Sequence, residues 1–357
     1  MANILYCMNT SWGWIKQRPH FIAEGLSKRN NVCVLSKHVP FSRKDATDTV
    51  DLHYFYRMPG ERYKAVAFIN LIIYIIQFFI YSRKFDIIWL SNPVDYRFAR
   101  FFTSRKKIIY DCMDDQIELI DNPQRKKLVH RWEQLLYHRS DIVLASADFL
   151  KNVLISRYGE REIYVVNNAI KDGFGEASKE SGDINLSLSD DEISISYIGT
   201  IASWMDWDLV YCVLKEIPNT KFHFFGPVDY KPSIDNPRII FHGSLEHDKV
   251  PVAMANSKIL IMPFVVNDLI KSVNPVKLYE YIYSGRPCIA PSYGESLKFG
   301  DFVYLYSDKK HCVEIIRKIV DERFCPKRTV EECKDFISNN TWSSRVDQIE
   351  KSINSLK

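Results

Sequence analysis

Short apolar runs alternate with longer amphipathic segments along most of the chain. The first half contains the apolar runs NILYCMN, NVCVLSK, DIIWLSNP, KKIIYDC, DIVLAS and IYVVNNAI, and segments with helical spacing of apolar residues lie between them. Continuous apolar runs of this length predict strands buried on both faces, and their alternation with helices predicts a parallel sheet. The alternation restarts at ISISYIGT and continues through KFHFFGP, RIIFHGS, KILIMPF, PCIAPS and FVYLYS. The pattern therefore predicts an α/β protein with two doubly wound parallel sheets.

A polar segment separates the two series of strands. Residues 171–190 are rich in glycine, serine and acidic residues and poor in apolar ones, which is typical of a linker. A chain of 357 residues is also too long for one ordinary core. We therefore expect an N-terminal domain over 1–170, a linker over 171–190 and a C-terminal domain over 191–340.

Composition and charge narrow the class of protein. The chain is 46% hydrophobic and 26% charged, which is typical of a globular protein. A net charge of +4 does not indicate a nucleic-acid-binding surface. The N-terminus reads as a strand and not as a signal peptide, and the eight cysteines form no C-x-x-C pair. We therefore expect a cytoplasmic protein with reduced cysteines, no metal site and no nucleic-acid partner.

Residues 65–82 form an almost wholly apolar segment with two basic residues close to each end. Its length of roughly 18 residues is at the lower limit for a membrane-spanning helix. Asn70 and Gln77 interrupt it, and a predicted strand follows at once. We expect a helix that is buried or lies on a membrane, while a transmembrane span and a partner interface remain alternatives.

The segment SVNPVKLYEYIYSGRPCIA, residues 272–290, carries the strongest indication of chemistry. It predicts a loop, a helix with Pro275 in its first turn, a turn at Gly285 and a buried strand. Lys277 and Glu280 fall near the start of this helix, where backbone N–H groups already favour an anion. The alternative is an exposed i,i+3 ion pair that contributes a few tenths of a kcal/mol.

The sequence resembles glycosyltransferases of the GT-B class. KLYEYIYSGRPCIA is similar to the donor-binding helix of the retaining family 4. QRPHFIAEGL, YDCMDD, YIGTIASWMDWDLV and NPVKLYEY are similar to segments of bacterial transferases of teichuronic-acid, exopolysaccharide and O-antigen assembly. The resemblance implies two Rossmann-like domains facing each other across a cleft, the first binding the acceptor and the second the nucleotide sugar. It also implies that a final helix, residues 341–357, crosses back onto the first domain.

The resemblance assigns roles in donor binding. Glu280 matches the second glutamate of the family's two-glutamate motif, which holds the ribose hydroxyls, and Lys277 would meet the diphosphate. Ser272 stands where the first glutamate would contact the sugar, and the usual arginine and lysine after the glycine turn are missing. The donor sugar and the stereochemistry therefore stay open. The predicted donor-binding set is Gly13, Gly199, Thr200, Asp206, Gly226, Gly243, Ser272, Asn274, Lys277 and Glu280.

Candidate acceptor and catalytic residues lie in the first domain. Asp114 and Asp115, in YDCMDD after a predicted strand, are candidates for the general base of an inverting transferase. Alternatively, Asp115 caps the helix that begins near QIELI. Capping of the helix that starts at Trp207 is likewise the alternative to a donor contact for Asp206. In a retaining enzyme the carboxylate would instead orient the acceptor. The predicted acceptor-binding set is Trp12, Trp14, Arg18 and His20, with structural burial of at least one tryptophan as the alternative.

The resemblance thus implies a metal-independent, cytoplasmic glycosyltransferase that works on the inner face of the membrane. It would move a sugar from a nucleotide diphosphate donor, UDP favoured, to a hydroxyl of a lipid-linked bacterial surface glycan. No metal cofactor is expected, although Asp206-Trp207-Asp208 has the D-x-D spacing at the start of a predicted helix. Two alternatives remain: a nucleotide-sugar 2-epimerase with the GT-B fold, and a non-catalytic subunit that binds a nucleotide sugar or a partner transferase.

Overall fold

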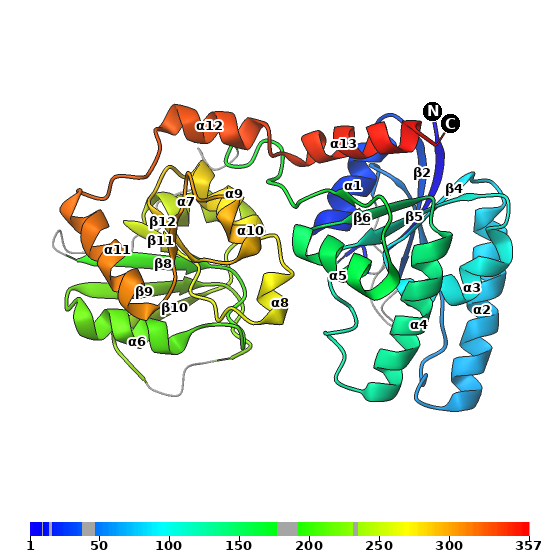
Figure 1. The fold of residues 1–357 in the computed structure, drawn as a ribbon, viewed down its shortest axis with the longest axis horizontal. Coiled ribbons are helices and arrows are strands. Elements are labelled where there is room, and N and C mark those ends of the chain that lie inside the picture. The colour runs from blue at the N-terminus through cyan, green and yellow to red at the C-terminus, as the bar shows by residue number, and fades with distance from the viewer. Residues whose placement is uncertain (9, 14–15, 38–46, 177–191, 231–234, 357) are drawn as a thin grey trace. The chain divides into compact units, whose positions relative to one another are not determined.

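The computed structural model describes residues 1–8, 10–13, 16–37, 47–176, 192–230 and 235–356. The chain forms two compact units (Figure 1). Unit 1 comprises Met1–Asn168 with Trp342–Lys357, and unit 2 comprises Ala169–Thr341. Most of the predicted linker, residues 177–190, lies outside the described residues.

In the described residues, unit 1 is built on a seven-stranded sheet in which every strand pair is parallel. The strand order is β3-β2-β1-β4-β5-β6-β7, with Ile4 of β1 paired to Val32 of β2 on one side and to Ile87 of β4 on the other. The predicted parallel α/β architecture is therefore confirmed for this unit. The strands are β1 Asn3–Cys7, β2 Asn31–Lys37, β3 Asp51–Phe55, β4 Ile87–Leu90, β5 Lys107–Cys112, β6 Ile142–Ala145 and β7 Tyr164–Val165.

Helices enclose this sheet because its strands are apolar on both faces. One face packs against residues of α2, α3, α4 and α5 in a single buried cluster, and α1 packs beside β2 with α13 against it. The α-helices are α1 Arg18–Ser27, α2 Lys64–Ser82, α3 Tyr96–Ala99, α4 Pro123–Arg139, α5 Asp148–Tyr158 and α13 Trp342–Asn354. Short 3₁₀ helices, η1 Pro93–Asp95 and η2 Arg100–Phe102, flank α3.

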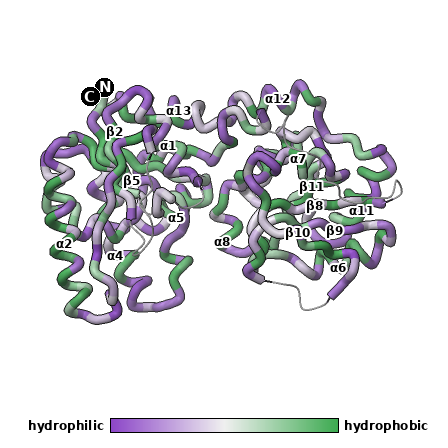
Figure 2. The backbone as a smooth tube through the Cα atoms, turned by 180° about the vertical axis from the view of Figure 1, so that it is seen from behind, coloured by the Kyte–Doolittle hydropathy of each residue, from purple (hydrophilic) through white to green (hydrophobic). Residues whose placement is uncertain are grey.

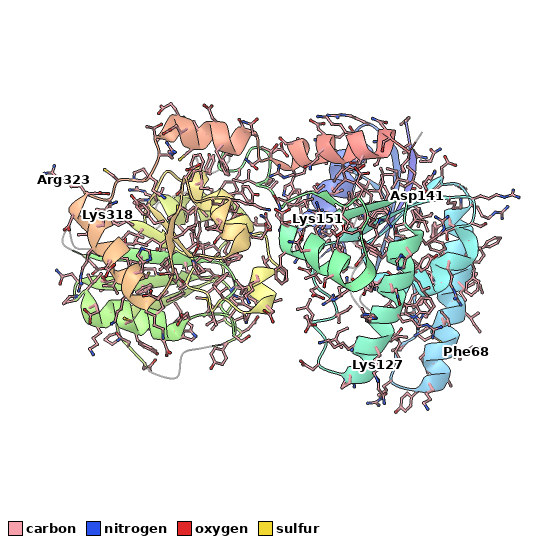
Figure 3. All side chains as sticks on the ribbon, viewed as in Figure 1. Phe68, Lys127, Asp141, Lys151, Lys318 and Arg323 are labelled. Carbon is pink, nitrogen blue, oxygen red and sulfur yellow. The ribbon has the colours of Figure 1, made fainter. Side chains whose placement is uncertain are left out.

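The apolar segment 65–82 forms α2, and most of its apolar side chains are exposed. Its buried residues are Asn70, Phe78 and Ser82. Phe68 points away from the sheet with 63% of its surface exposed (Figure 3). Among the described residues, α2 is the helix long and apolar enough to cross a membrane, and its hydrophobic character is visible along the tube in Figure 2. The helix is confirmed, but the buried alternative of the expectation is wrong, because only one side of α2 packs on the unit. The membrane-lying alternative stays a prediction.

Unit 2 repeats the same architecture. In the described residues it contains a six-stranded parallel sheet with the order β10-β9-β8-β11-β12-β13. Its strands are β8 Ile193–Ile198, β9 Thr220–Phe225, β10 Ile239–Gly243, β11 Ile259–Ile261, β12 Cys288–Pro291 and β13 Tyr304–Tyr306. Its helices are α6 Trp207–Glu216, η4 His247–Lys249, α7 Val250–Ala255, α8 Asp268–Lys271, α9 Val276–Tyr283, α10 Gly294–Leu297, α11 Lys309–Asp321 and α12 Val330–Ser338.

Each sheet has one point where the chain order of its strands reverses direction. In unit 1 it lies between β1 and β4, and in unit 2 between β8 and β11. Open α/β sheets bind ligands at the carboxyl ends of the strands beside such a point, because the two connecting loops separate there. A ligand site is therefore expected at the carboxyl edge of each sheet.

Candidate functional site

Two glycine turns build the carboxyl edge of the unit 2 sheet. Gly199 follows β8 and Gly226 follows β9, with φ angles of 148° and 142° that disfavour any other residue. The N–H of Gly199 donates to the carbonyl of Phe225 at 2.7 Å, and that of Gly226 donates to the carbonyl of Gly243, also at 2.7 Å. A Cβ on Gly226 would overlap the carbonyl of Gly199. The predicted Gly199, Gly226 and Gly243 therefore lie together, in turns that bring their backbones into close contact.

Lys277 reaches this edge from α9. The helix begins at Val276 after Pro275 and ends before Gly285, whose φ of 67° closes it as the sequence predicts. A Cβ on Gly199 would overlap the Lys277 ammonium, so the two residues are in direct contact. Lys277 Nζ lies 5.5 Å from the centroid of the Tyr197 ring. The loop after β8 and the helix α9 thus place the Lys277 ammonium against the backbone of Gly199.

The charge of Lys277 is not neutralised by a neighbour. The side chain is half-buried, and within the described part of the chain it makes no hydrogen bond and no ion pair. Burial lowers the pKa of Lys277, and the nearby Glu280 raises it. A half-buried ammonium without a partner is energetically unfavourable unless a ligand supplies the counter-charge. The position therefore fits an anion.

Glu280 lies one turn further along α9. It is half-buried, burial raises the pKa of its carboxyl group, and Lys277 lowers it. No ion pair joins Glu280 to Lys277 among the described residues, so they are not the exposed, paired couple that was the alternative interpretation. A carboxylate in this position is able to accept hydrogen bonds from two vicinal hydroxyl groups.

Ser272 and Asn274 have structural partners. Ser272 is 2% exposed, and its hydroxyl donates to the carbonyl of Leu269 at 2.7 Å. Asn274 is fully buried, and its Nδ2 donates to Glu295 Oε2 at 2.9 Å. Both side chains hold the loop that leads into α9. The geometry thus gives them a positioning role, and their predicted donor contacts stay predictions.

Thr200 and Asp206 follow β8 in the same loop. The carbonyl of Thr200 accepts from the Tyr197 hydroxyl at 2.9 Å, and this half-buried residue remains close to Gly199. Asp206 accepts from the N–H of Leu209 at 2.9 Å and so caps α6, as the alternative interpretation has it. Asp206 also lines a cavity of about 630 Å³ at the carboxyl ends of β11 to β13. Capping α6 therefore does not prevent Asp206 from contacting a ligand in this cavity.

In unit 1, the side chains predicted to contact the acceptor are mostly buried. Arg18 donates to Asp111 at 2.9 Å and to the carbonyl of Val166 at 2.6 Å. His20 is fully buried between the carbonyl of Trp12 and the N–H of Gln17, and burial lowers its pKa. These contacts fasten the start of α1 to the sheet. An acceptor contact by Arg18 or His20 stays a prediction that this burial does not favour.

The loop after β1 contains the remaining candidates. Trp12 is 8% exposed and its N–H donates to Ser36 Oγ at 3.0 Å, in agreement with the structural alternative for one tryptophan. Gly13 lies exposed in the turn that follows. Trp14 lies outside the described residues.

The two candidate bases have different surroundings. Asp115 accepts from the N–H groups of Ile117 and Glu118 at 3.2 and 3.3 Å, and Arg157 donates to both of its oxygens at 2.8 and 2.7 Å. Asp115 is thus a local cap and a buried ion-pair partner. Asp114 is exposed, and its carboxylate makes no hydrogen bond within the described part of the chain. The third carboxylate of YDCMDD, Asp111, lies inside β5 and pairs with Arg18.

One group in the described residues has the spacing of metal ligands: Cys33, Asp51 and His53, on adjacent strands. Burial and Asp51 raise the pKa of the Cys33 thiol, which opposes the thiolate that a metal requires. His53 is also engaged, by Asp51 at 3.0 Å and the Tyr81 hydroxyl at 3.3 Å. These residues fit a metal ion poorly.

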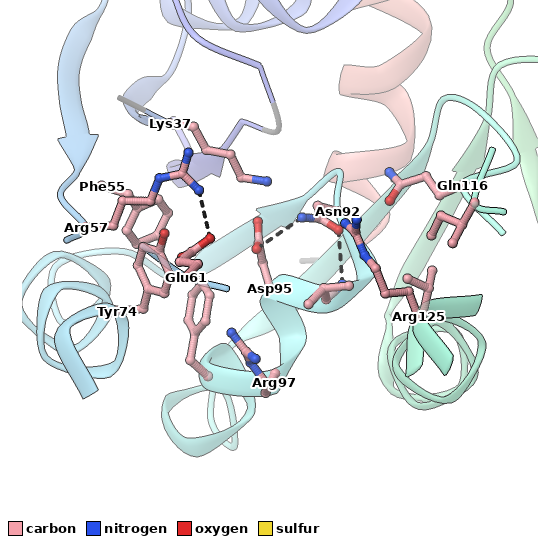
Figure 4. Close-up of a pocket in the computed structure, with 14 residues that line it drawn as sticks. Lys37, Phe55, Arg57, Glu61, Tyr74, Asn92, Asp95, Arg97, Gln116 and Arg125 are labelled. Atoms are coloured by element: carbon pink, nitrogen blue, oxygen red, sulfur yellow. Dashed lines mark hydrogen bonds and ion pairs between the residues drawn. The ribbon is translucent and has the colours of Figure 1, made fainter. Parts of the chain in front are cut away.

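A cavity of about 390 Å³ at the carboxyl edge of the unit 1 sheet was not predicted. This edge cavity is lined from β2, β3, the loop after β4, α3 and α4 (Figure 4). Its polar residues include Lys37, Asn92, Asp95, Arg97 and Arg125. The run SNPVDYR after β4 supplies three of them but matches no motif, so the only available signal was its position after a strand beside the switch point.

Comparison with known proteins places this geometry in context. A protein of Bacillus subtilis (strain 168) named "Putative teichuronic acid biosynthesis glycosyltransferase TuaH" is 24% identical over 225 residues. The match covers 59% of this chain and 57% of that protein, so the chain spans little more than half of its relative. No protein-family model matches the chain.

Solved structures match the chain over nearly its full length. Sucrose-phosphate synthase from Thermosynechococcus elongatus has a TM-score of 0.75 at 12% identity, and the match covers 99% of both chains. HepE from Anabaena, in complex with UDP and glucose, has a TM-score of 0.73 at 13% identity and covers 99% of this chain and 100% of its own. The structure titled "Trehalose-6-phosphate from E. coli bound with UDP-2-fluoro glucose" has a TM-score of 0.72 at 7% identity and covers 98% of both chains. The predicted resemblance is confirmed, and the chain has the GT-B fold of two Rossmann-like α/β domains.

Proposed function

We propose that the protein is a glycosyltransferase that takes its sugar from a nucleotide diphosphate donor, with UDP favoured. The observation that carries the proposal is the half-buried, unpaired Lys277 against the Gly199 turn, one helical turn before Glu280. The diphosphate would supply the missing counter-charge, and Glu280 would accept from the ribose hydroxyls. UDP and glucose in HepE, and the teichuronic-acid name of the Bacillus relative, support this assignment.

The reaction we propose transfers a glycosyl group to an acceptor hydroxyl. The bond between the anomeric carbon and the phosphate oxygen breaks, a bond from the anomeric carbon to the acceptor oxygen forms, and the nucleotide diphosphate leaves with the electron pair. Lys277 would stabilise the negative charge that develops on the leaving diphosphate. No metal is proposed, because the Lys277 ammonium would supply the positive charge at the diphosphate.

Asp114 is the better of the two candidate bases. Its carboxylate is free of hydrogen bonds in the described structure, whereas Asp115 is held by Arg157. Desolvation by the surrounding protein raises the pKa of Asp114, which favours proton acceptance, while Arg18 lowers this pKa. If the reaction inverts the anomeric centre, Asp114 would take the proton of the acceptor hydroxyl.

We also propose that the acceptor is lipid-linked and that α2 rests on the inner face of the membrane. The exposed residues Phe68, Ile72, Ile76 and Phe79 recur at helical spacing and so lie on one side of α2. The Arg83 guanidinium lies 5.3 Å from the centroid of the Phe79 ring at the end of this apolar side. Aromatic and aliphatic side chains bordered by cations suit an anionic interface. A helix that lies in the interface, unlike one that spans the membrane, also allows β3 and β4 to belong to the same sheet.

The proposal is tested by donor turnover. UDP-glucose, GDP-mannose, ADP-glucose and dTDP-glucose would be incubated with the protein, with and without EDTA, and released nucleotide measured. We expect release from a UDP-sugar that EDTA does not abolish. The Asp114→Asn variant should bind UDP normally but lose about 10²-fold or more in transfer to an acceptor. Nucleotide binding without any turnover would favour the non-catalytic alternative, and interconversion of the sugar without transfer would favour the epimerase.

A further inference from the structure

The edge cavity of unit 1 has more cations than acidic partners. Lys37, Arg57, Arg97 and Arg125 line it, together with the carboxylates of Glu61 and Asp95. Arg57 and Glu61 neutralise each other at 3.0 Å (Figure 4).

Two of its guanidinium groups form no ion pair with an acidic side chain among the described residues. Within the described part of the chain, Arg97 and Arg125 form no ion pair, and the buried Nε of Arg97 has no hydrogen-bond acceptor. An unsatisfied buried donor lowers stability, more so when it belongs to a charged group, so a ligand that accepts from Arg97 removes an existing penalty.

A buried carboxylate lies among these cations. Asp95 is 8% exposed and accepts from Asn92 Nδ2 at 3.2 Å, while Asn92 Oδ1 accepts from the N–H of Val94 at 3.1 Å. The second contact fixes which way the Asn92 amide points. Burial raises the pKa of Asp95, and Lys37 and Arg97 lower it. The remaining lone pairs of the Asp95 carboxylate can accept hydrogen bonds from the hydroxyl groups of a ligand, whereas they would repel an anionic group of that ligand.

One wall of the cavity is aromatic. The ring centroids of Phe55 and Tyr74 are 5.4 Å apart, and those of Phe55 and Phe98 are 5.5 Å apart. Phe55 and Phe98 are 3% and 2% exposed, so the half-buried Tyr74 is the ring available to pack against the C–H surface of a sugar. The cavity thus combines an apolar wall, a hydroxyl acceptor and guanidinium groups without an ion pair.

We propose that the edge cavity of unit 1 binds an anionic sugar of the acceptor, that is, a saccharide carrying a carboxylate or a phosphate. The inference rests on the proposed glycosyltransferase function and names the chemical class of its acceptor. Guanidinium groups bind carboxylates and phosphates through paired hydrogen bonds, which a neutral sugar does not offer. A neutral sugar would leave Arg97 and Arg125 as they are in the free protein.

The test compares four small ligands by ligand-observed NMR titration: methyl β-glucuronide, glucose 1-phosphate, methyl β-glucoside and inorganic phosphate. We expect at least one anionic sugar to bind tenfold or more tightly than the neutral glucoside and than inorganic phosphate. Preference for the glucuronide or for glucose 1-phosphate identifies the anionic group. The binding should weaken with added salt, because the cations are partly open to solvent.

Three variants locate the binding. Arg97→Gln and Arg125→Gln should each weaken the anionic sugar at least fivefold, whereas Arg105→Gln, an exposed arginine outside the cavity, should not. Arg125 is exposed, so its variant should fold normally. UDP affinity should stay unchanged in all three, and it serves as an independent readout of the donor site.

Three results would overturn the inference. They are equal binding of glucoside and anionic sugars, anionic-sugar binding that neither cavity variant weakens, and inorganic phosphate that binds as tightly as the anionic sugars. If any of these three results is found and the wild-type protein binds UDP, the anionic-sugar proposal is refuted and the proposed function is not. If the wild-type protein neither binds UDP nor turns over a donor, the proposed function itself is refuted.

Discussion

Two lysines near α9 show how differently the same side chain is used at the residue scale. Lys271, on α8, is exposed and donates to Asp268 at 3.0 Å, so its charge is balanced at the surface. Lys277 is half-buried against Gly199 and has no such partner in the described structure. Exposed pairs contribute little to stability, whereas an unpaired, desolvated cation lowers it. An anion bound at Lys277 would remove this unfavourable term.

A histidine pair in unit 2 gives a pH prediction. His223 is fully buried, with its Nδ1 2.9 Å from Nε2 of His242, and burial together with His242 lowers the pKa of His223 to about 4. Its unfolded value is about 6.5, so between these pH values the unfolded state binds a proton that the native state does not. Stability should therefore fall as the pH decreases, and this group alone should remove about 2 kcal/mol between pH 7.5 and 5.0.

Urea unfolding at pH 7.5 and 5.0 checks this prediction. In His223→Asn, which keeps a polar partner for His242, the loss of stability between the two pH values should shrink by about 2 kcal/mol. His138→Asn removes an exposed histidine and should leave the difference unchanged. An identical pH dependence in wild type and His223→Asn would contradict the assignment.

Part of the donor site could be predicted from residues, and part could not. Gly199, Gly226, Lys277 and Glu280 were placed together because loops after parallel strands share an edge. Ser272 was selected only by its position relative to Glu280, and the chain turns its side chain into the fold. Arg97 and Asp95 of the edge cavity belong to no motif, and their convergence with Arg125 depends on how α3 and α4 pack.

At the scale of elements, α2 is expected to act as a membrane contact. The Phe68→Asp/Ile76→Asp variant places two charges on its exposed apolar side and should weaken binding to phosphatidylglycerol vesicles about tenfold or more, because it removes apolar burial of at least about 1–2 kcal/mol. Vesicle flotation measures this. Leu297→Asp changes an exposed apolar residue of unit 2 and is the matched control. Wild-type protein that does not float with anionic vesicles would contradict a membrane role for α2.

The contact between α1 and α13 gives a stability prediction. Phe21 and Trp342 stack at 5.3 Å, and a Cβ on Gly25 would overlap Val346. Alanine normally stabilises a helix interior relative to glycine, but here the overlap should reverse the sign, so that Gly25→Ala destabilises by about 1–3 kcal/mol.

A double variant separates contact from propensity. Val346→Ala removes the overlapping methyl groups. In the Val346→Ala background, Gly25→Ala should therefore cost less stability than it does in the wild-type protein. Thermal unfolding of the four proteins completes the cycle. A Gly25→Ala protein that is more stable than wild type would show that α13 moves away without cost.

At the scale of the whole molecule, the chain builds the same plan twice. Both sheets are parallel, which the alternation of apolar runs predicted because buried parallel strands are apolar on both faces, and the strand order of each has one central switch point. The exposure of α2 could not be predicted in this way, since an apolar helix has the same sequence whether protein or lipid covers it. The chain also returns to unit 1 at its end, where Arg345 donates to the carbonyl of Asn167 at 3.1 Å.

The central claim is that unit 2 holds a nucleotide diphosphate at Lys277, and calorimetric titration of UDP tests it most directly. Wild type should bind UDP, Lys277→Met should bind it at least tenfold more weakly, a loss of about 1.4 kcal/mol, and Lys271→Met should bind it like wild type. If wild type does not bind UDP, or if Lys277→Met binds it as tightly as wild type, the donor site is not at α9 and the account is wrong.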